Sequence, residues 1–331
     1  MADLSNVSTP VRVAGFVAAL VAVFGLTLLA GRAFGPVGEE VAGSEQSDGH
    51  GHGATTPAPT GTTGSAGSTG SSAPSEHAAH LPGGLQVSQD GYSLQLLQTE
   101  YSAAGNSHIV FVIQGPDGAP VTEYVPQHEK ELHLIAVRRD FSGFQHVHPE
   151  MSIDGTWSTS LALTPGSWRL FADTAPKGAE PLTLGADVSV AGTFAPAAAP
   201  VADLRTAEVD GYTVNLQGDL TPGKDSALTL SVSRGGQPVT NLDPYLGAYG
   251  HLVALREGDL AYLHVHPEGH PGDGTTKPGP GITFGTTVPS PGTYHFYLDF
   301  QHKGVVRTAA FTVTAEGPTA GAEGGHDDHA H

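Results

Sequence analysis

The residues best suited to chemistry in this chain are histidines that recur at one fixed spacing. The segment Phe-Gln-His-Val-His-Pro-Glu at 144–150 returns as Tyr-Leu-His-Val-His-Pro-Glu at 262–268. In each copy a further histidine, His133 or His251, lies thirteen positions before the first histidine of the pair. In a β-strand the two histidines of His-x-His project to the same face, about 7 Å apart, so both can reach one ion. The repeated pattern therefore indicates metal coordination.

Three imidazoles in each copy could form a metal site with an open position. Imidazole nitrogens suit Zn(II) and Cu(II), and a fourth ligand could be water or a carboxylate. We predict Cu(II) or Zn(II) as the bound ion. The predicted ligands form two triads: His133, His146 and His148, and His251, His264 and His266. Each copy also repeats an aspartate at the end of a later strand, Asp173 and Asp299, which could bind the ion or orient a ligand histidine.

The same histidines also have a purely structural interpretation. A histidine in a sandwich strand can be a hydrogen-bonded, half-buried polar residue, and His-Pro-Glu can be a turn in which proline ends the strand. Identical spacing in two copies that differ at most other positions favours the metal interpretation. No nucleophile, general base or oxyanion donor set accompanies the triads, so we predict that the protein is not an enzyme.

Composition excludes several other classes of protein. The chain has no cysteine, which excludes disulfides, lipoprotein acylation, iron–sulfur clusters and thiolate zinc sites. A copper electron-transfer site of the usual kind also requires a cysteine ligand. The formal net charge of −19 disfavours nucleic acid as a partner, because nucleic-acid binding relies on basic surface.

The part of the chain that carries the histidines has the pattern of a duplicated β-domain. From residue 85 on, short runs rich in Val, Leu, Ile, Thr and Tyr alternate with Gly, Pro, Asn and Asp turns, which is typical of an all-β sandwich. The pattern restarts in the second half, where Asp-Gly-Tyr at 90–92 returns at 210–212. We predict an all-β fold of two tandem immunoglobulin-like β-sandwich domains, 84–193 and 204–315, joined by a hinge at 194–203.

The segments outside the sandwiches predict a membrane tether. After a polar cytoplasmic stretch at 1–12, Val13–Gly31 is an uncharged, mainly apolar run long enough to cross a bilayer, so residues 13–35 are a predicted transmembrane helix. A cleaved signal peptide is the alternative. The histidine-containing linker at 36–83 and the acidic, histidine-containing tail at 316–331 have almost no large apolar side chains and are predicted to be disordered. The expected location is a single-pass anchor in the cell membrane, with the sandwiches extracytoplasmic.

Two pairs of segments resemble a group of bacterial, often actinobacterial, exported proteins. They are Leu132–Val137 with Phe144–Pro149, and His251–Leu255 with Tyr262–Pro267. Members of that group carry β-sandwich modules with a similar histidine motif and are described as heavy-metal-associated or copper-homeostasis proteins. The resemblance covers about residues 85–315, and the second copy departs from the motif where Tyr-Leu replaces Phe-Gln. It implies metal handling outside the cytoplasm, with a metal-transport or surface protein as a possible partner.

Two functions therefore remain open. The first is a membrane-anchored extracytoplasmic protein that binds copper or zinc through the repeated histidine site. The alternative is a cell-surface interaction module of immunoglobulin-like domains in which the histidines are structural.

Overall fold

The computed structural model describes residues 82–198, 203–263 and 265–317. The predicted anchor, the linker up to residue 81 and the tail from residue 318 lie outside these residues. Within the described part of the chain no helix is long and apolar enough to cross a membrane.

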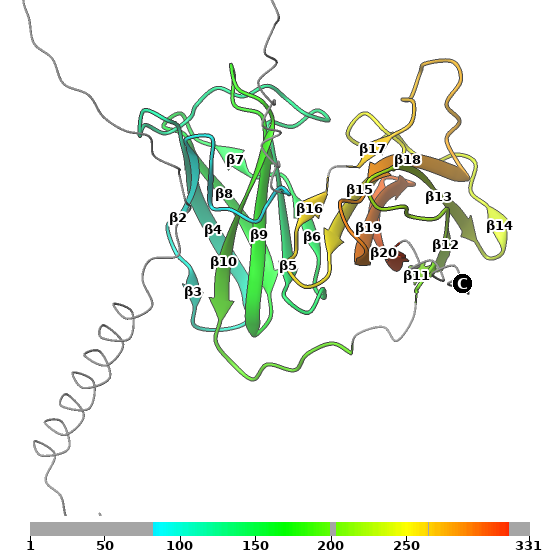
Figure 1. Ribbon diagram of the computed structural model, residues 1–331, viewed down its shortest axis with the longest axis horizontal. Coiled ribbons are helices and arrows are strands. Elements are labelled where there is room, and N and C mark those ends of the chain that lie inside the picture. The colour runs from blue at the N-terminus through cyan, green and yellow to red at the C-terminus, as the bar shows by residue number, and fades with distance from the viewer. Residues whose placement is uncertain (1–81, 199–202, 264, 318–331) are drawn as a thin grey trace, which may run out of the picture. The chain divides into compact units, whose positions relative to one another are not determined.

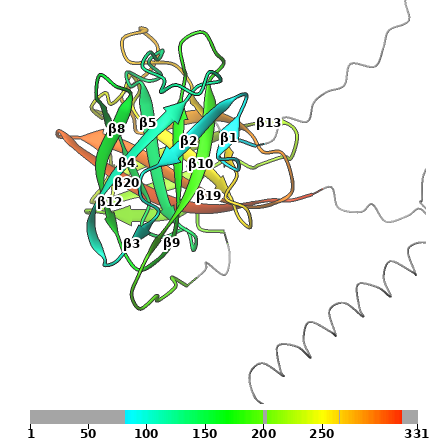
Figure 2. The same ribbon diagram turned by 90° about the vertical axis from the view of Figure 1, so that its left-hand side faces the viewer.

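The first repeat is a sandwich of two five-stranded sheets, with strand orders β1-β2-β4-β8-β7 and β3-β10-β9-β5-β6 (Figure 1, Figure 2). Its strands are β1 (Ser88–Gln89), β2 (Tyr92–Leu96), β3 (Glu100–Tyr101), β4 (Gly105–Gln114), β5 (Leu132–Arg138), β6 (Gln145–Val147), β7 (Glu150–Met151), β8 (Thr156–Leu163), β9 (Gly166–Thr174) and β10 (Leu182–Val190). The orders β2-β4-β8-β7 and β10-β9-β5 match the ABED and GFC sheets of the immunoglobulin fold.

The second repeat has the same plan, with sheets β11-β12-β13-β18-β17 and β16-β15-β19-β20 and with β14 paired to β13. Its strands are β11 (Thr206–Val209), β12 (Tyr212–Gln217), β13 (Asp225–Arg234), β14 (Gln237–Pro238), β15 (His251–Arg256), β16 (Tyr262–Leu263), β17 (His266–Pro267), β18 (Gly281–Thr287), β19 (Gly292–His302) and β20 (Val305–Ala315). The prediction of two tandem immunoglobulin-like sandwiches is confirmed.

Each core is formed by the inward-facing side chains of strands in which buried and exposed residues alternate. Along β4 the inward positions are fully buried while their neighbours are exposed or half-buried, because successive side chains in a strand point to opposite faces. Trp168 on β9 and Tyr294 on β19 are 1% and 0% exposed, so both are core aromatics. Each contributes about 3 kcal/mol through burial of its ring.

The strand that carries His133 is buried along both faces, and the contact between the repeats explains why. One face of β5 covers the core of its own sandwich, and the other meets the second repeat. The cluster between the repeats comprises Ile135, Val137, Phe171, Val253, Leu255, Leu260, Tyr262 and Tyr297. At its edge the rings of Phe144 and Tyr297 stack 4.0 Å apart, and the Tyr297 hydroxyl donates to the carbonyl oxygen of Phe141 at 2.6 Å.

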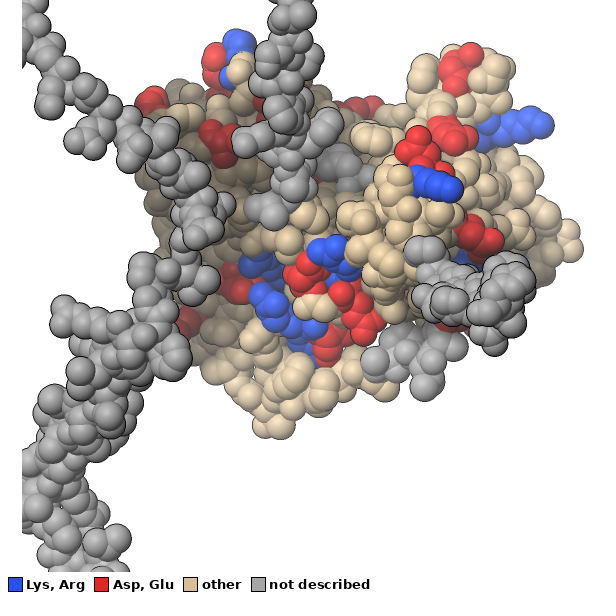
Figure 3. All heavy atoms as spheres, in the orientation of Figure 1, with Lys and Arg blue, Asp and Glu red and all other residues tan. Residues whose placement is uncertain are grey.

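Charged side chains on the surface are mixed by sign. Figure 3 shows acidic and basic residues interspersed on one face. Ion pairs in the described part of the chain include Arg138 with Asp140 at 2.7 Å and Arg139 with Asp187 at 2.6 Å. On this face the net negative charge is not gathered into one patch.

Candidate metal centre

The first predicted triad is brought together by two neighbouring strands. His133 lies on β5, and His146 lies on β6, which pairs antiparallel with β5 so that Ile135 faces His146. His148 follows directly after β6. The three side chains offer ligand atoms that all lie within 4.8 Å of one another. The strand that carries His133 is therefore the direct neighbour of the strand that carries His146.

The separations between the nitrogens suit a small ion. His133 Nδ1 lies 2.9 Å from His146 Nε2 and 3.2 Å from His148 Nε2. Two ligand nitrogens at 2.0–2.1 Å from a tetrahedral ion would be about 3.3 Å apart. The third pair of nitrogens, from His146 and His148, lies within 4.8 Å, so movements of the rings would place an ion within bonding distance of all three nitrogens.

Partners on the far side of two rings decide which nitrogens carry hydrogen. His133 Nε2 lies 2.9 Å from the carbonyl oxygen of Gln127, and a carbonyl only accepts, so Nε2 donates and Nδ1 is left with its lone pair. His146 Nδ1 lies 2.8 Å from Asp299 Oδ2, so by the same reasoning its lone pair is on Nε2. Two lone pairs therefore face each other at 2.9 Å, an arrangement that requires a cation between them.

Two cations could satisfy this arrangement, namely a proton between the two nitrogens or a metal ion. Burial lowers the pKa of His133 to about 4, and burial together with the neighbouring His146 lowers the pKa of His148 to about 3. Both rings are therefore neutral at pH 7 and keep lone pairs for coordination. A proton can bridge only one pair of nitrogens, whereas a metal ion can bind all three, so the donor set fits Zn(II) or Cu(II).

The carboxylate beside the centre comes from the other repeat. Asp299 lies opposite His251 in the pairing of β15 with β19, yet it accepts a hydrogen bond from His146, and the two side chains are each only 5% exposed. Thr308 donates to its other oxygen at 2.5 Å. Asp299 thus orients His146, a candidate ligand, and this is the geometry that the predicted orienting role would require.

The second predicted triad is described only in part, because His264 lies outside the described residues. His251 on β15 is 7% exposed, and its Nε2 donates to the carbonyl oxygen of Tyr245 at 2.9 Å, as His133 does to Gln127. His266 on β17 is exposed. Asp173, the counterpart of Asp299, accepts hydrogen bonds from Tyr262 at 3.2 Å and from Thr183 at 2.9 Å. The second triad stays a prediction.

A cavity of about 70 Å³ lies between the repeats. Its lining includes imidazoles from both of them: His128, His133, His146, His251 and His266. Because the cavity adjoins two nitrogen donors of the first triad, it has room for the water molecule or small ligand that would complete a metal's coordination. Comparison of the two repeats could not single out His128 as a candidate site residue, because it aligns with Leu246 in the second repeat and is therefore not repeated.

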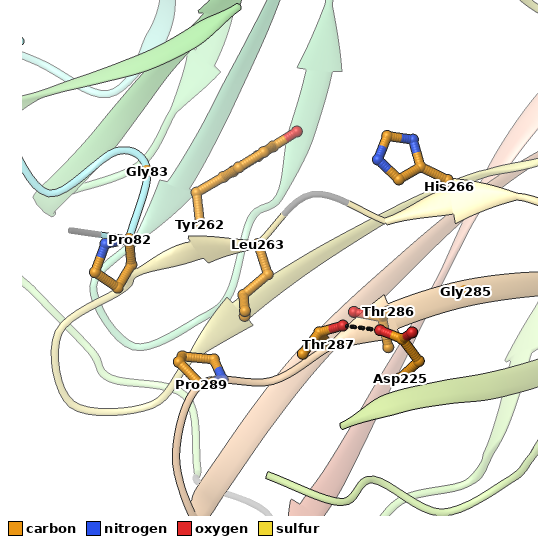
Figure 4. Close-up of a pocket in the computed structure, with 10 residues that line it drawn as sticks. All are labelled: Pro82, Gly83, Asp225, Tyr262, Leu263, His266, Gly285, Thr286, Thr287 and Pro289. Carbon is orange, nitrogen blue, oxygen red and sulfur yellow. Dashed lines mark hydrogen bonds between the residues drawn. The ribbon is translucent and has the colours of Figure 1, made fainter. Parts of the chain in front are cut away.

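Two surface hollows give access to these residues. One, of about 650 Å³, shares Tyr262 and His266 with the cavity, and Figure 4 shows the hydroxyl end of Tyr262 and the ring of His266 on the same side of their segment. The other, of about 500 Å³, is lined by His148 together with three glutamates and one lysine, namely Glu129, Glu131, Glu150 and Lys130. Carboxylates around a half-buried histidine raise the local concentration of cations.

The solved structures that match the chain include two bacterial adhesins. The Escherichia coli adhesin FdeC is 14% identical with a TM-score of 0.22, over 69% of this chain and 63% of that one. The Yersinia pseudotuberculosis adhesin InvE is 13% identical with a TM-score of 0.21, over 70% and 60%. The D0-D1 domain of intimin is 14% identical with a TM-score of 0.19, over 67% and 97%. The chain spans less than two thirds of the length of either adhesin.

No curated protein matches the chain. A family model described as a domain of unknown function, DUF8832, matches residues 86–192 and again residues 207–317. These two stretches are the two sandwiches and together make up more than half of the sequence. The chain therefore belongs to the DUF8832 family and carries two tandem copies of its domain.

Proposed function

We propose that the protein binds a divalent transition-metal ion, Cu(II) or Zn(II), through His133, His146 and His148. The observation that carries this proposal is the convergence of three ring nitrogens, two of which have lone pairs fixed by partners on the far side of their rings. Neutral imidazoles without thiolates favour borderline ions over the hard ions Mg²⁺ and Ca²⁺, which prefer oxygen ligands.

The role we propose is metal handling outside the cytoplasm, in a protein held at the membrane by its N-terminal segment. The apolar run in that segment and the total lack of cysteine support this location, since a cysteine-free histidine site remains functional in an oxidising compartment. Access through His148 and its acidic surroundings suits exchange of an ion with solution or with a metal-transport partner.

Calorimetric titration of the full-length chain with Cu(II) and with Zn(II), in a buffer containing a weak chelator, tests the proposal. The chelator suppresses binding by exposed histidines. We expect a tight site that disappears in the double variant His146→Ala/His148→Ala. The matched control, His108→Ala/His270→Ala, removes two exposed histidines and should keep that site. Equal metal binding by both variants, or no tight site in the wild type, would refute the proposal.

The second candidate is a cell-surface interaction module in which the histidines hold the repeats together. The hydrogen bond between His146 and Asp299 joins the repeats, which favours this role, and the tandem immunoglobulin-like fold is common to both candidates. The adhesin names among the matched structures agree with it, but at TM-scores near 0.2 they add no argument. If the protein is such a module, His146→Ala/His148→Ala should unfold at a lower denaturant concentration than the wild type. Metal would then not change the stability of the wild type.

A further inference from the structure

Two imidazoles outside the three-histidine centre meet edge to face in the cavity between the repeats. His128 belongs to the loop before β5 of the first repeat, and His251 begins β15 of the second. Their ring centroids lie 5.1 Å apart with the ring planes at 79°. The ring of His128 is also 6.2 Å from that of His133, so this pair lies beside the first centre.

The spacing of this pair equals the spacing inside the first centre. There the three ring-centroid separations are 5.2, 4.9 and 4.9 Å. Two imidazoles bound to one tetrahedral ion have centroids about 5 Å apart, given the usual metal–nitrogen distance. His128 and His251 are therefore separated as two ligands of one ion would be.

A backbone hydrogen bond fixes the hydrogen of one of these rings, and the other ring is open to solution. His251 Nε2 donates to the carbonyl oxygen of Tyr245, so its Nδ1 carries a lone pair, as His133 Nδ1 does. His128 has φ of 46° and its counterpart Leu246 has φ of 53°, so this left-handed conformation belongs to the same loop in both repeats. His128 is exposed, so an ion could reach it from solution.

Carboxylates next to the cavity could balance the charge of a second cation. Asp173 lines the cavity and lies opposite His133 in the pairing of β5 with β9, just as Asp299 lies opposite His251. Each repeat thus places one buried or half-buried carboxylate on the neighbouring strand, directly opposite a candidate ligand histidine. Two such charges offset part of the repulsion between neighbouring dications.

We propose that His128 and His251, one from each repeat, bind a second divalent transition-metal ion in this cavity, beside the three-histidine centre. The inference rests on the proposed function and makes the metal centre a paired site that only the two repeats together can form. Water or other side chains that line the cavity complete the coordination.

Cu(II) titration of the full-length chain, followed by calorimetry and by electron paramagnetic resonance, tests the inference with His128→Ala. His128 is an exposed loop residue, so the variant is expected to fold; His108→Ala on β4 is the matched control. We expect the wild type and the control to bind two ions tightly and to show a spin-coupled copper signal. The His128→Ala variant should bind the second ion at least tenfold more weakly and lose the coupled signal, while the first ion still binds.

The outcomes separate this inference from the function on which it rests. If the wild type binds one ion through His146 and His148, or if His128→Ala still binds two coupled ions, the second site is refuted and the first stands. If the wild type binds no ion tightly, both fail. Circular dichroism of each variant checks that the fold is retained, and His251→Ala should reproduce the loss of the second ion.

Discussion

Removal of the Asp299 carboxylate should weaken metal binding by a centre made entirely of residues from the other repeat. Asp299 accepts a 2.8 Å hydrogen bond from His146, and both side chains are 5% exposed. The carboxylate fixes the hydrogen on Nδ1, which leaves Nε2 available for the ion and makes it more basic. In Asp299→Ala the ring of His146 can rotate, and either nitrogen can carry the hydrogen.

Loss of such an orienting group typically lowers metal affinity tenfold to a hundredfold, or about 1.4–2.8 kcal/mol. An upper bound comes from the charge itself. A carboxylate about 7 Å from a dication, across the imidazole ring, attracts it by about 5 kcal/mol at an effective dielectric constant of about 20. Water that enters the space left by the side chain replaces part of this attraction, so we expect the smaller range.

The assay is competition with a chelator of known affinity, using Zn(II) and full-length Asp299→Ala, Asp299→Asn and the control Asp243→Ala. Asp243 accepts a backbone hydrogen bond from Gly304 at 2.8 Å and does not line the cavity. The asparagine variant can still accept through its amide oxygen but has no charge, so it separates orientation from electrostatic attraction. Wild-type affinity in a folded Asp299→Ala protein would refute the reasoning.

Three further predictions concern stability, each measured by urea unfolding. Burial lowers the pKa of His133 and His251 from 6.5 to about 4. As the pH falls, these histidines therefore take up protons in the unfolded chain before they do so in the folded protein. The free energy of unfolding should be largest above about pH 6.5 and decrease steadily toward about pH 4. Equal stability at both ends of that range would contradict this. A methyl group on Gly185 would lie 2.0 Å from the backbone oxygen of Gly84, whereas one on Gly285 would meet nothing within 4 Å. Gly185→Ala should therefore cost about 1–3 kcal/mol or more, and a cost no greater than that of Gly285→Ala would contradict it. Tyr297→Phe removes a 2.6 Å hydrogen bond between the repeats and should cost about 1 kcal/mol; an unchanged midpoint would show that water replaces the hydroxyl.

The sequence by itself determined the fold class, the duplication and the first histidine triad. Alternation with a period of two residues is set by the geometry of a single strand, so it can be read locally. The pairing of β5 with β6, which joins His133 to His146, links segments close in sequence. Repetition then marked the three histidines as a set. None of this required knowledge of how the sandwiches meet.

Only the tertiary structure decided which carboxylate accepts a hydrogen bond from which histidine, and which residues line the same cavity. The repeat pattern pairs Asp299 with His251 in its own domain, but contact between the sheets places it on His146, 153 positions away in sequence. His128 has no counterpart in the second repeat, so no comparison within the chain could connect it with His251. Both contacts arise where two sheet faces pack together, and the apolar side chains that direct this packing carry no local pattern that specifies their partner.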